Sequence, residues 1–172
     1  MRPCNFMAGK RATSHRVLLL VGSIGPLGHC PASGTVAVAV AGIPLFWLMS
    51  SWPLLVYLVV TLAFSLASVW VHQAGDRILG EKDSRKLVWD ELAGFMVAMT
   101  LVPFTWQLVT IGFFLERLID IAKIPPANLI EKHVPGGWGV VGDDLMAGAY
   151  TCAILHLLIH YAPAWVGVTV GV

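Results

Sequence analysis

The apolar positions of this chain form long uninterrupted runs, without the alternating pattern of half-buried strands. Residues 17–75 contain no Asp, Glu, Lys or Arg, and this stretch is about three times as long as one membrane-spanning helix. Turn signals divide it into residues 35–50 and, after "SSWP", residues 53–71. At the usual helical rise these segments are about 24 and 28 Å long. We therefore expect a helical hairpin that crosses a bilayer.

A second hairpin is predicted after the charged loop "GDRILGEKDSRK". The next apolar run, residues 87–121, contains Pro103 near its middle, and a proline there removes a backbone hydrogen bond and clashes with the preceding turn. We interpret the run as two helices, residues 87–103 and 104–121, with one long kinked helix as the alternative. A Pro- and Gly-rich loop, residues 123–142, leads to a last span at residues 143–161 and an apolar C-terminal tail, residues 162–172.

The segment "VLLLVGSIGPLGHCPASGT", residues 17–35, does not fit a span because glycine and proline destabilise helices. Irregular backbone at membrane depth is tolerated where protein or water satisfies its polar groups. We expect a glycine-rich re-entrant or interfacial segment here, after a basic N-terminus of residues 1–16. A short amphipathic anchor with a flexible link is the alternative. The fold prediction is an all-α integral membrane protein with about five transmembrane helices in one domain, residues 1–172.

Composition and charge support a membrane protein and exclude other classes. The chain is 57% hydrophobic and 12% charged, with a mean hydropathy of +0.77, which leaves too little polar surface for a soluble globule. A net charge of +1 and the lack of a recognition motif argue against nucleic acid as a partner. Three scattered cysteines do not indicate disulfides or a metal site.

The loop charges predict the orientation of the chain. Basic residues occur before the first span and in the two long loops, whereas the two short hairpin connections and the C-terminal tail have none. The positive-inside rule then places the N-terminus and both charged loops in the cytoplasm and the C-terminus outside.

Acidic residues cluster at the predicted helix ends, where their cost is smaller than the roughly 2.5 to 3.5 kcal/mol of an acid at the bilayer centre. In the hairpin topology six of them meet on the cytoplasmic side, and a single helix over residues 87–121 would instead separate Asp90 from Asp120. Gathered carboxylates repel one another unless cations lie between them, and oxygen ligands suit Mg²⁺ or Mn²⁺. The six are Asp83, Asp90, Glu91, Asp120, Asp143 and Asp144.

A local repeat indicates how these acids approach one another. In "WDELAG" and "GDDLMAG" an aspartate precedes a glycine by four residues, so Asp90 and Gly94 share one helix face, as do Asp144 and Gly148. Small residues at such positions allow close helix packing in membranes. Near another helix end, Arg117 and Lys123 are candidates for binding a phosphate; snorkelling and orientation charge are the alternative.

Three motifs then resemble a known family in order and spacing. "LVWDELAG", "RLIDIAK" and "GGWGVVGDDLMAG" are similar to the motifs of phosphatidylglycerophosphatase A, a family of bacterial membrane lipid phosphatases, and "GSIGPLGHCPASGT" resembles its glycine-rich opening segment. The sequence departs from the family pattern at Glu116, which replaces an aromatic residue. It departs again at Ile124, where the family has proline.

The resemblance implies Mg²⁺-dependent hydrolysis of phosphatidylglycerophosphate to phosphatidylglycerol and phosphate, in the bacterial inner membrane with the active site on the cytoplasmic side. It implies the six acids as metal ligands, with Asp90, Glu91, Asp143 and Asp144 also catalytic. Arg117, Lys123, Gly34 and Thr35 are implied as substrate-binding residues. Alternatives from other classes are a membrane cation transporter and a non-catalytic lipid-binding membrane subunit.

Overall fold

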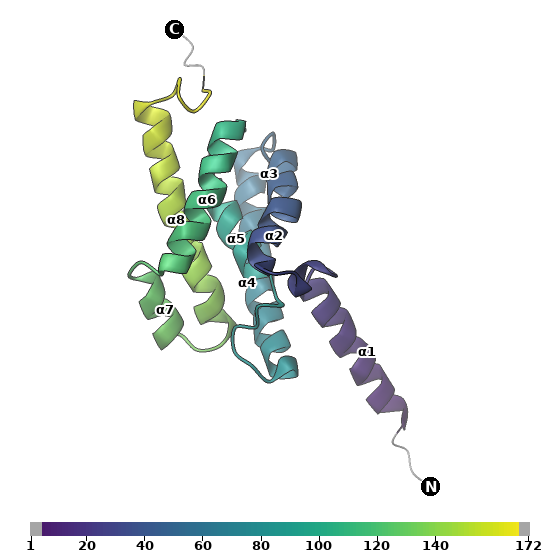
Figure 1. Ribbon diagram of the computed structural model, residues 1–172. Coiled ribbons are helices and arrows are strands. Elements are labelled where there is room, and N and C mark those ends of the chain that lie inside the picture. The colour runs from purple at the N-terminus through teal and green to yellow at the C-terminus, as the bar shows by residue number, and fades with distance from the viewer. Residues whose placement is uncertain (1–4, 169–172) are drawn as a thin grey trace.

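The computed structural model describes residues 5–168, and this part of the chain contains helices and no strand (Figure 1). The all-α prediction is therefore confirmed. The helices are α1 Asn5–Gly22, the 3-10 turn η1 Leu27–His29, α2 Ser33–Ala37, the π-helical η2 Val38–Gly42, α3 Ile43–Met49, α4 Leu54–Leu79, α5 Trp89–Ala98, α6 Trp106–Ala122, α7 Ala127–His133 and α8 Gly137–Tyr161.

The first predicted hairpin is present, with a longer second arm. α2, η2 and α3 follow one another without a break, and "SSWP" leads into α4. α4 continues to Leu79, beyond the predicted end at residue 71, because Gly75 does not end the helix and packs against Leu87 instead. The helix stops at Gly80, whose φ of 73° closes it in a left-handed conformation that glycine adopts without strain.

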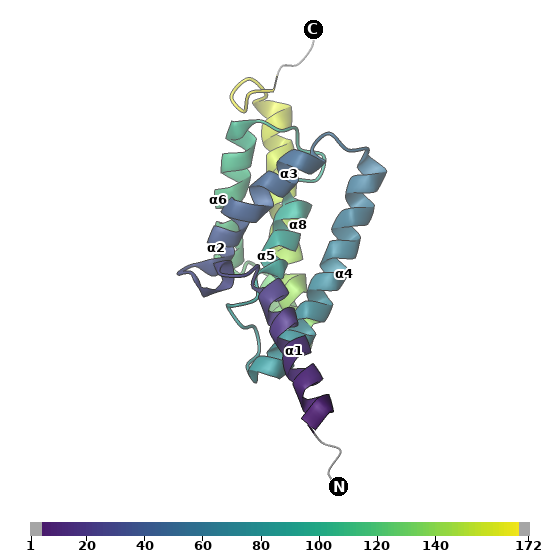
Figure 2. The same ribbon diagram turned by 90° about the vertical axis from the view of Figure 1, so that its right-hand side faces the viewer.

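The chain breaks around Pro103, so the alternative of one long helix is wrong. α5 ends at Ala98 and α6 begins at Trp106. The hydroxyl of Thr105 caps α6 by accepting a 3.2 Å hydrogen bond from the backbone N–H of Leu108. In Figure 2 the α3–α4 turn, the α5–α6 connection and the C-terminal end of α8 lie at one end of the bundle.

Three further predictions of element boundaries need correction. α1 extends to Gly22 and takes in the first part of the predicted irregular segment, so only residues 23–32 are irregular apart from η1. α7 occupies part of the predicted loop 123–142. α8 begins at Gly137 and not at residue 143, because "GWGVVG" continues the helix despite its glycines.

One described helix, α4, is long and apolar enough to cross a membrane by length and composition, and Ser33–Met49 is a shorter apolar helix. α5 has 10 residues, which corresponds to about 15 Å, half of a hydrocarbon core of about 30 Å. α6 has 17 residues. The prediction of about five spans is therefore not confirmed by the helices and stays a prediction.

α5 lies at the centre of the bundle, where its packing determines the position of the acids. Two glycines bring it against the backbone of α8: a side chain at Gly94 would begin 2.8 Å from the carbonyl oxygen of Asp144, and one at Gly148 would overlap the carbonyl oxygen of Gly94. The predicted close packing is confirmed. Beyond this crossing, away from the acids, Phe46 and Phe95 belong to a buried apolar core.

Gly148→Ala tests the helix crossing. The added methyl overlaps the carbonyl oxygen of Gly94, so we expect the free energy of unfolding to fall by about 1 to 3 kcal/mol, the usual cost of overpacking. Thermal unfolding of the purified protein in detergent measures the change. Ala149→Val, at an exposed position of the same helix, is the control and should leave the unfolding temperature unchanged. Equal stability of the two variants would contradict the close contact.

Candidate active site

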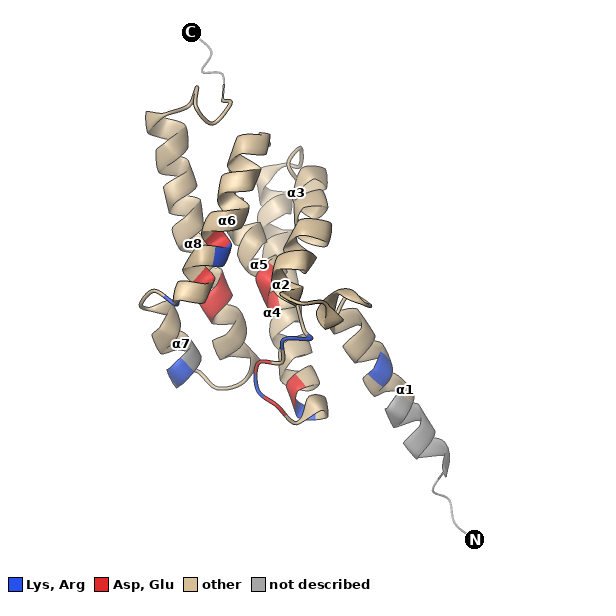
Figure 3. Cartoon of the chain, in the orientation of Figure 1, with Lys and Arg blue, Asp and Glu red and all other residues tan. Residues whose placement is uncertain are grey.

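A cavity of about 280 Å³ opens at the end of the bundle that carries the charged loop between α4 and α5. Figure 3 shows the charged residues away from the end that holds the α3–α4 turn. All six predicted acids line the cavity, together with Lys123, so the expected convergence is confirmed. The lining residues are Asp83, Arg85, Leu87, Asp90, Glu91, Asp120, Ile121, Lys123, Val140, Asp143 and Asp144.

Among the six acids of the cavity, the most deeply buried come from α5 and α8. Asp90 and Glu91 stand in the first turn of α5, where the unpaired N–H groups of the helix favour negative charge. Asp143 and Asp144 lie almost two turns inside α8, because that helix begins at Gly137. Exposure of Asp90, Asp143 and Asp144 is 5%, 4% and 5%, so these carboxylates depend on protein groups or bound cations for compensation.

Lys123 is the predicted cation that reaches the cavity. It follows the end of α6 in a left-handed conformation, with φ at 47°, and its Nζ lies 2.9 Å from Oδ2 of Asp143. A cation suited to phosphate therefore stands beside the aspartate pair.

Arg117 takes a different position from the one expected of a phosphate ligand. Its Nε and Nη2 donate two hydrogen bonds of 2.6 Å to the carboxylate of Glu116, and its Nη1 lies 3.4 Å from Oδ2 of Asp120. Arg117 is not among the residues that line the cavity. Its guanidinium therefore compensates two carboxylates of α6, and a role in phosphate binding stays a prediction.

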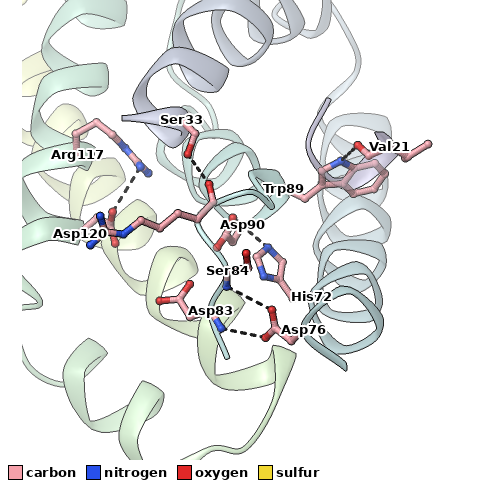
Figure 4. Close-up of polar contacts among 11 residues, drawn as sticks. Val21, Ser33, His72, Asp76, Asp83, Ser84, Trp89, Asp90, Arg117 and Asp120 are labelled. Atoms are coloured by element: carbon pink, nitrogen blue, oxygen red, sulfur yellow. Dashed lines mark hydrogen bonds and ion pairs between the residues drawn. The ribbon is translucent and has the colours of Figure 1, made fainter. Parts of the chain in front are cut away.

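The loop that carries Asp83 and Arg85 is held by contacts at its base (Figure 4). Oδ2 and Oδ1 of Asp76 accept hydrogen bonds from the backbone N–H groups of Asp83, at 3.1 Å, and Ser84, at 3.4 Å. The Ser33 hydroxyl donates to the backbone carbonyl of Arg85. These contacts from α4 and α2 fix the loop across the mouth of the cavity.

Gly34 has a steric role next to Glu91. A side chain at Gly34 would overlap Oε1 of Glu91, so only glycine allows α2 to approach the acid this closely. Neither Gly34 nor Thr35 lines the cavity. Their predicted role in substrate binding stays a prediction.

The acids suit a divalent cation for two reasons: they offer carboxylate oxygens, and several of them are buried, where their charge needs compensation. Oε2 of Glu91 is buried without a hydrogen-bond partner among the described residues, and carboxylate oxygens are the donor type that Mg²⁺ and Mn²⁺ prefer. As the described side chains stand, no three His, Cys, Asp or Glu groups are arranged around one metal position. Metal binding at this site therefore requires side-chain rotation within the cavity.

Three functional candidates were missed by the sequence analysis. Arg85 lines the cavity, although basic residues in the loops of membrane proteins ordinarily indicate orientation. Glu116 is fully buried, and an acid inside an apolar helix beside an arginine is a signal for a buried pair. His72, also fully buried, lies with Nε2 3.1 Å from Oδ1 of Asp90; its sequence neighbourhood gives no sign of this contact.

Comparison with known proteins identifies relatives along most of the chain. The family model described as phosphatidylglycerophosphatase A matches residues 20–159. The chain is 33% identical over 127 residues to phosphatidylglycerophosphatase A of Escherichia coli, covering 73% of each protein. It is 28% identical over 148 residues to the Haemophilus influenzae protein of the same name, covering 84% of the chain and 88% of the relative.

A third relative carries a different name. A putative phosphatidylinositol-3-phosphatase of Bacteroides thetaiotaomicron is 31% identical over 96 residues, covering 54% of the chain and 58% of that protein. No solved structure matches the chain.

Glu116→Gln tests the buried pair. It leaves the guanidinium of Arg117 without its bidentate partner, so we expect the protein to lose about 3 to 5 kcal/mol of stability, as when one member of a buried ion pair is removed. Thermal unfolding in detergent measures the loss. Glu81→Gln makes the same change at an exposed carboxylate and should have little effect. A Glu116→Gln variant as stable as the wild type would contradict the structural role of the pair.

Proposed function

Since the chain belongs to the phosphatidylglycerophosphatase A family and is thus a lipid phosphatase, we propose that it hydrolyses phosphatidylglycerophosphate to phosphatidylglycerol and inorganic phosphate. The observation that carries the proposal is the convergence of six carboxylates and two basic side chains on one cavity. Membership of an enzyme family also favours this function over a cation transporter or a non-catalytic subunit.

We propose Mg²⁺ as the cofactor, held by carboxylates of α5, α6 and α8. Asp90, Glu91 and Asp144 are the central candidates because they lie next to the α5–α8 crossing, and Asp120, Asp143 and, from the α4–α5 loop, Asp83 complete the set. These carboxylates would hold Mg²⁺, which would supply positive charge for the phosphate oxygens and lower the pKa of a water bound to it. The buried Oε2 of Glu91 supports this assignment because the described residues offer it no donor.

The remaining groups of the cavity bind and orient the phosphomonoester. Lys123 already contacts Asp143, so it can exchange this carboxylate for a phosphate oxygen by a small movement. Arg85 lines the same cavity and provides a planar fork for phosphate. One acid of the Asp143 and Asp144 pair accepts the proton of the attacking water. Arg117 does not line the cavity but pairs with Asp120, and its positive charge stabilises this carboxylate.

We propose that the protein lies in the bacterial inner membrane with the cavity at the cytoplasmic face. The positive-inside rule supports this orientation, because the charged loops and the cavity occupy the same end of the bundle. α4 and the apolar helix Ser33–Met49 provide the first crossings. α6 and α8 are the further crossings, and α5, whose helix is about half as long as the hydrocarbon core, packs among the other helices with no exposed residue. The headgroup of a lipid then reaches the acids while its acyl chains stay in the bilayer.

Asp144→Asn tests the catalytic assignment. Removing a carboxylate that holds metal or accepts a proton should lower kcat at least about 100-fold. Phosphate release from phosphatidylglycerophosphate in detergent with Mg²⁺ measures the rate. The variant should unfold no earlier than the wild type, because it removes one of several like charges. Glu81→Gln, outside the cavity, should keep wild-type activity. Wild-type activity in Asp144→Asn would refute the assignment.

A cysteine scan tests the orientation. In a protein with its three native cysteines replaced by serine, Ser51→Cys, in the exposed α3–α4 turn, should react with a membrane-impermeant maleimide from outside the cell. Lys86→Cys, in the charged loop and also exposed, should react only after the membrane is permeabilised. Labelling of Lys86→Cys in intact cells would reverse the orientation.

A further inference from the structure

His72 contacts an acid of the site but does not line the cavity. It belongs to α4, has no solvent exposure, and places Nε2 3.1 Å from Oδ1 of Asp90. Asp90 lines the cavity and His72 does not. Figure 4 shows the imidazole and the Asp90 carboxylate facing each other, with His72 rising from α4. The ring therefore contacts Asp90, which lines the cavity, without lining the cavity itself.

The pattern of contacts around the ring is unusual for a histidine that only fills space. A buried imidazole normally has hydrogen-bond partners at both nitrogens. Among the described residues, neither ring nitrogen of His72 makes a hydrogen bond, and the polar contact of the ring is the 3.1 Å distance between Nε2 and Oδ1 of Asp90. The polar contact of this side chain is thus with one oxygen of the Asp90 carboxylate.

The backbone that carries His72 is held rigidly against the rest of the site. A side chain at Gly137, at the start of α8, would overlap the carbonyl oxygen of Val69, and it would lie 3.0 Å from the backbone nitrogen of Gln73. α8 therefore contacts α4 on both sides of His72 in the sequence. A side chain fixed in this way can fix its partner in turn.

We propose that His72 is a positioning residue, which holds one oxygen of Asp90 so that the carboxylate presents its other oxygen to a divalent cation in the cavity. This inference rests on the proposed function, in which Asp90 is a metal ligand. Groups that orient a ligating side chain commonly change metal affinity 10- to 100-fold when they are removed. His72 acts through Asp90 and touches neither substrate nor water in the reaction.

The test measures binding of Mn²⁺ alone to the purified protein in detergent, from the electron paramagnetic resonance signal of the free ion. His72→Leu removes the donor, and we expect the Kd for Mn²⁺ to rise about 10-fold or more. His72→Gln keeps an N–H donor at a similar reach and should restore affinity close to that of the wild type. Ser68→Ala is the matched control, because Ser68 is buried one helical turn earlier on α4.

The outcomes separate this inference from the metal site itself. If the wild type binds Mn²⁺ and His72→Leu binds it as tightly or more tightly, the positioning role is refuted and the metal site stands. Equally weak binding by His72→Gln and His72→Leu also refutes it, because packing of the ring would then matter and not its donor. A wild type that does not bind Mn²⁺ overturns the metal site and this inference together.

A second variant keeps the proposal testable if His72→Leu does not fold. His72→Asn carries a shorter amide that does not reach Asp90, so we expect the same loss of Mn²⁺ affinity in a polar and less disruptive background. The activation constant for Mg²⁺ in phosphate release should rise in parallel in these variants, while KM for the lipid stays unchanged. A change in KM without a change in the Mg²⁺ constant would contradict the proposal.

Discussion

The close crossing of α5 and α8 is the contact on which the rest of the structure depends. Gly94 and Gly148 allow the two backbones to touch, and each glycine lies one helical turn after an aspartate of the site. Any larger residue at the crossing would push the helices apart and enlarge the distance between Asp90 and Asp144. Helix packing and the chemistry of the cavity are thus determined by the same pair of motifs.

Placing several carboxylates close together inside the protein costs electrostatic free energy. Basic side chains that contact these carboxylates reduce the cost. Lys123 contacts Asp143, His72 contacts Asp90, and Arg117 lies between two carboxylates of α6. The contacts His72–Asp90 and Lys123–Asp143 join different helices, so they help to hold the end of the bundle together, whereas Arg117 pairs with carboxylates of its own helix. These contacts also leave carboxylate oxygens directed at the cavity, where a divalent cation adds the remaining compensation.

The sequence predicts the elements that have strong local signals. Pro103 marks the break between α5 and α6 because proline cannot continue a helix, and this break places Asp90 and Asp120 at one end. Helix boundaries near glycine were less predictable: Gly75 and "GWGVVG" lie inside helices because tertiary packing overrides their low helix propensity. The roles of His72 and Arg85 depend on contacts between distant segments, which no local pattern encodes, whereas Glu116 pairs with its neighbour Arg117 and so has a local signal. The short α5 was also unexpected, because an apolar run does not show where its helix stops.

The most direct test of the account is phosphate release from phosphatidylglycerophosphate by the purified wild-type protein, with Mg²⁺ and with a chelator in its place. A metal site built from the six carboxylates predicts release that requires Mg²⁺, disappears on chelation and returns when Mg²⁺ is added again. No release under any condition, or the same rate in the presence of the chelator, would contradict it.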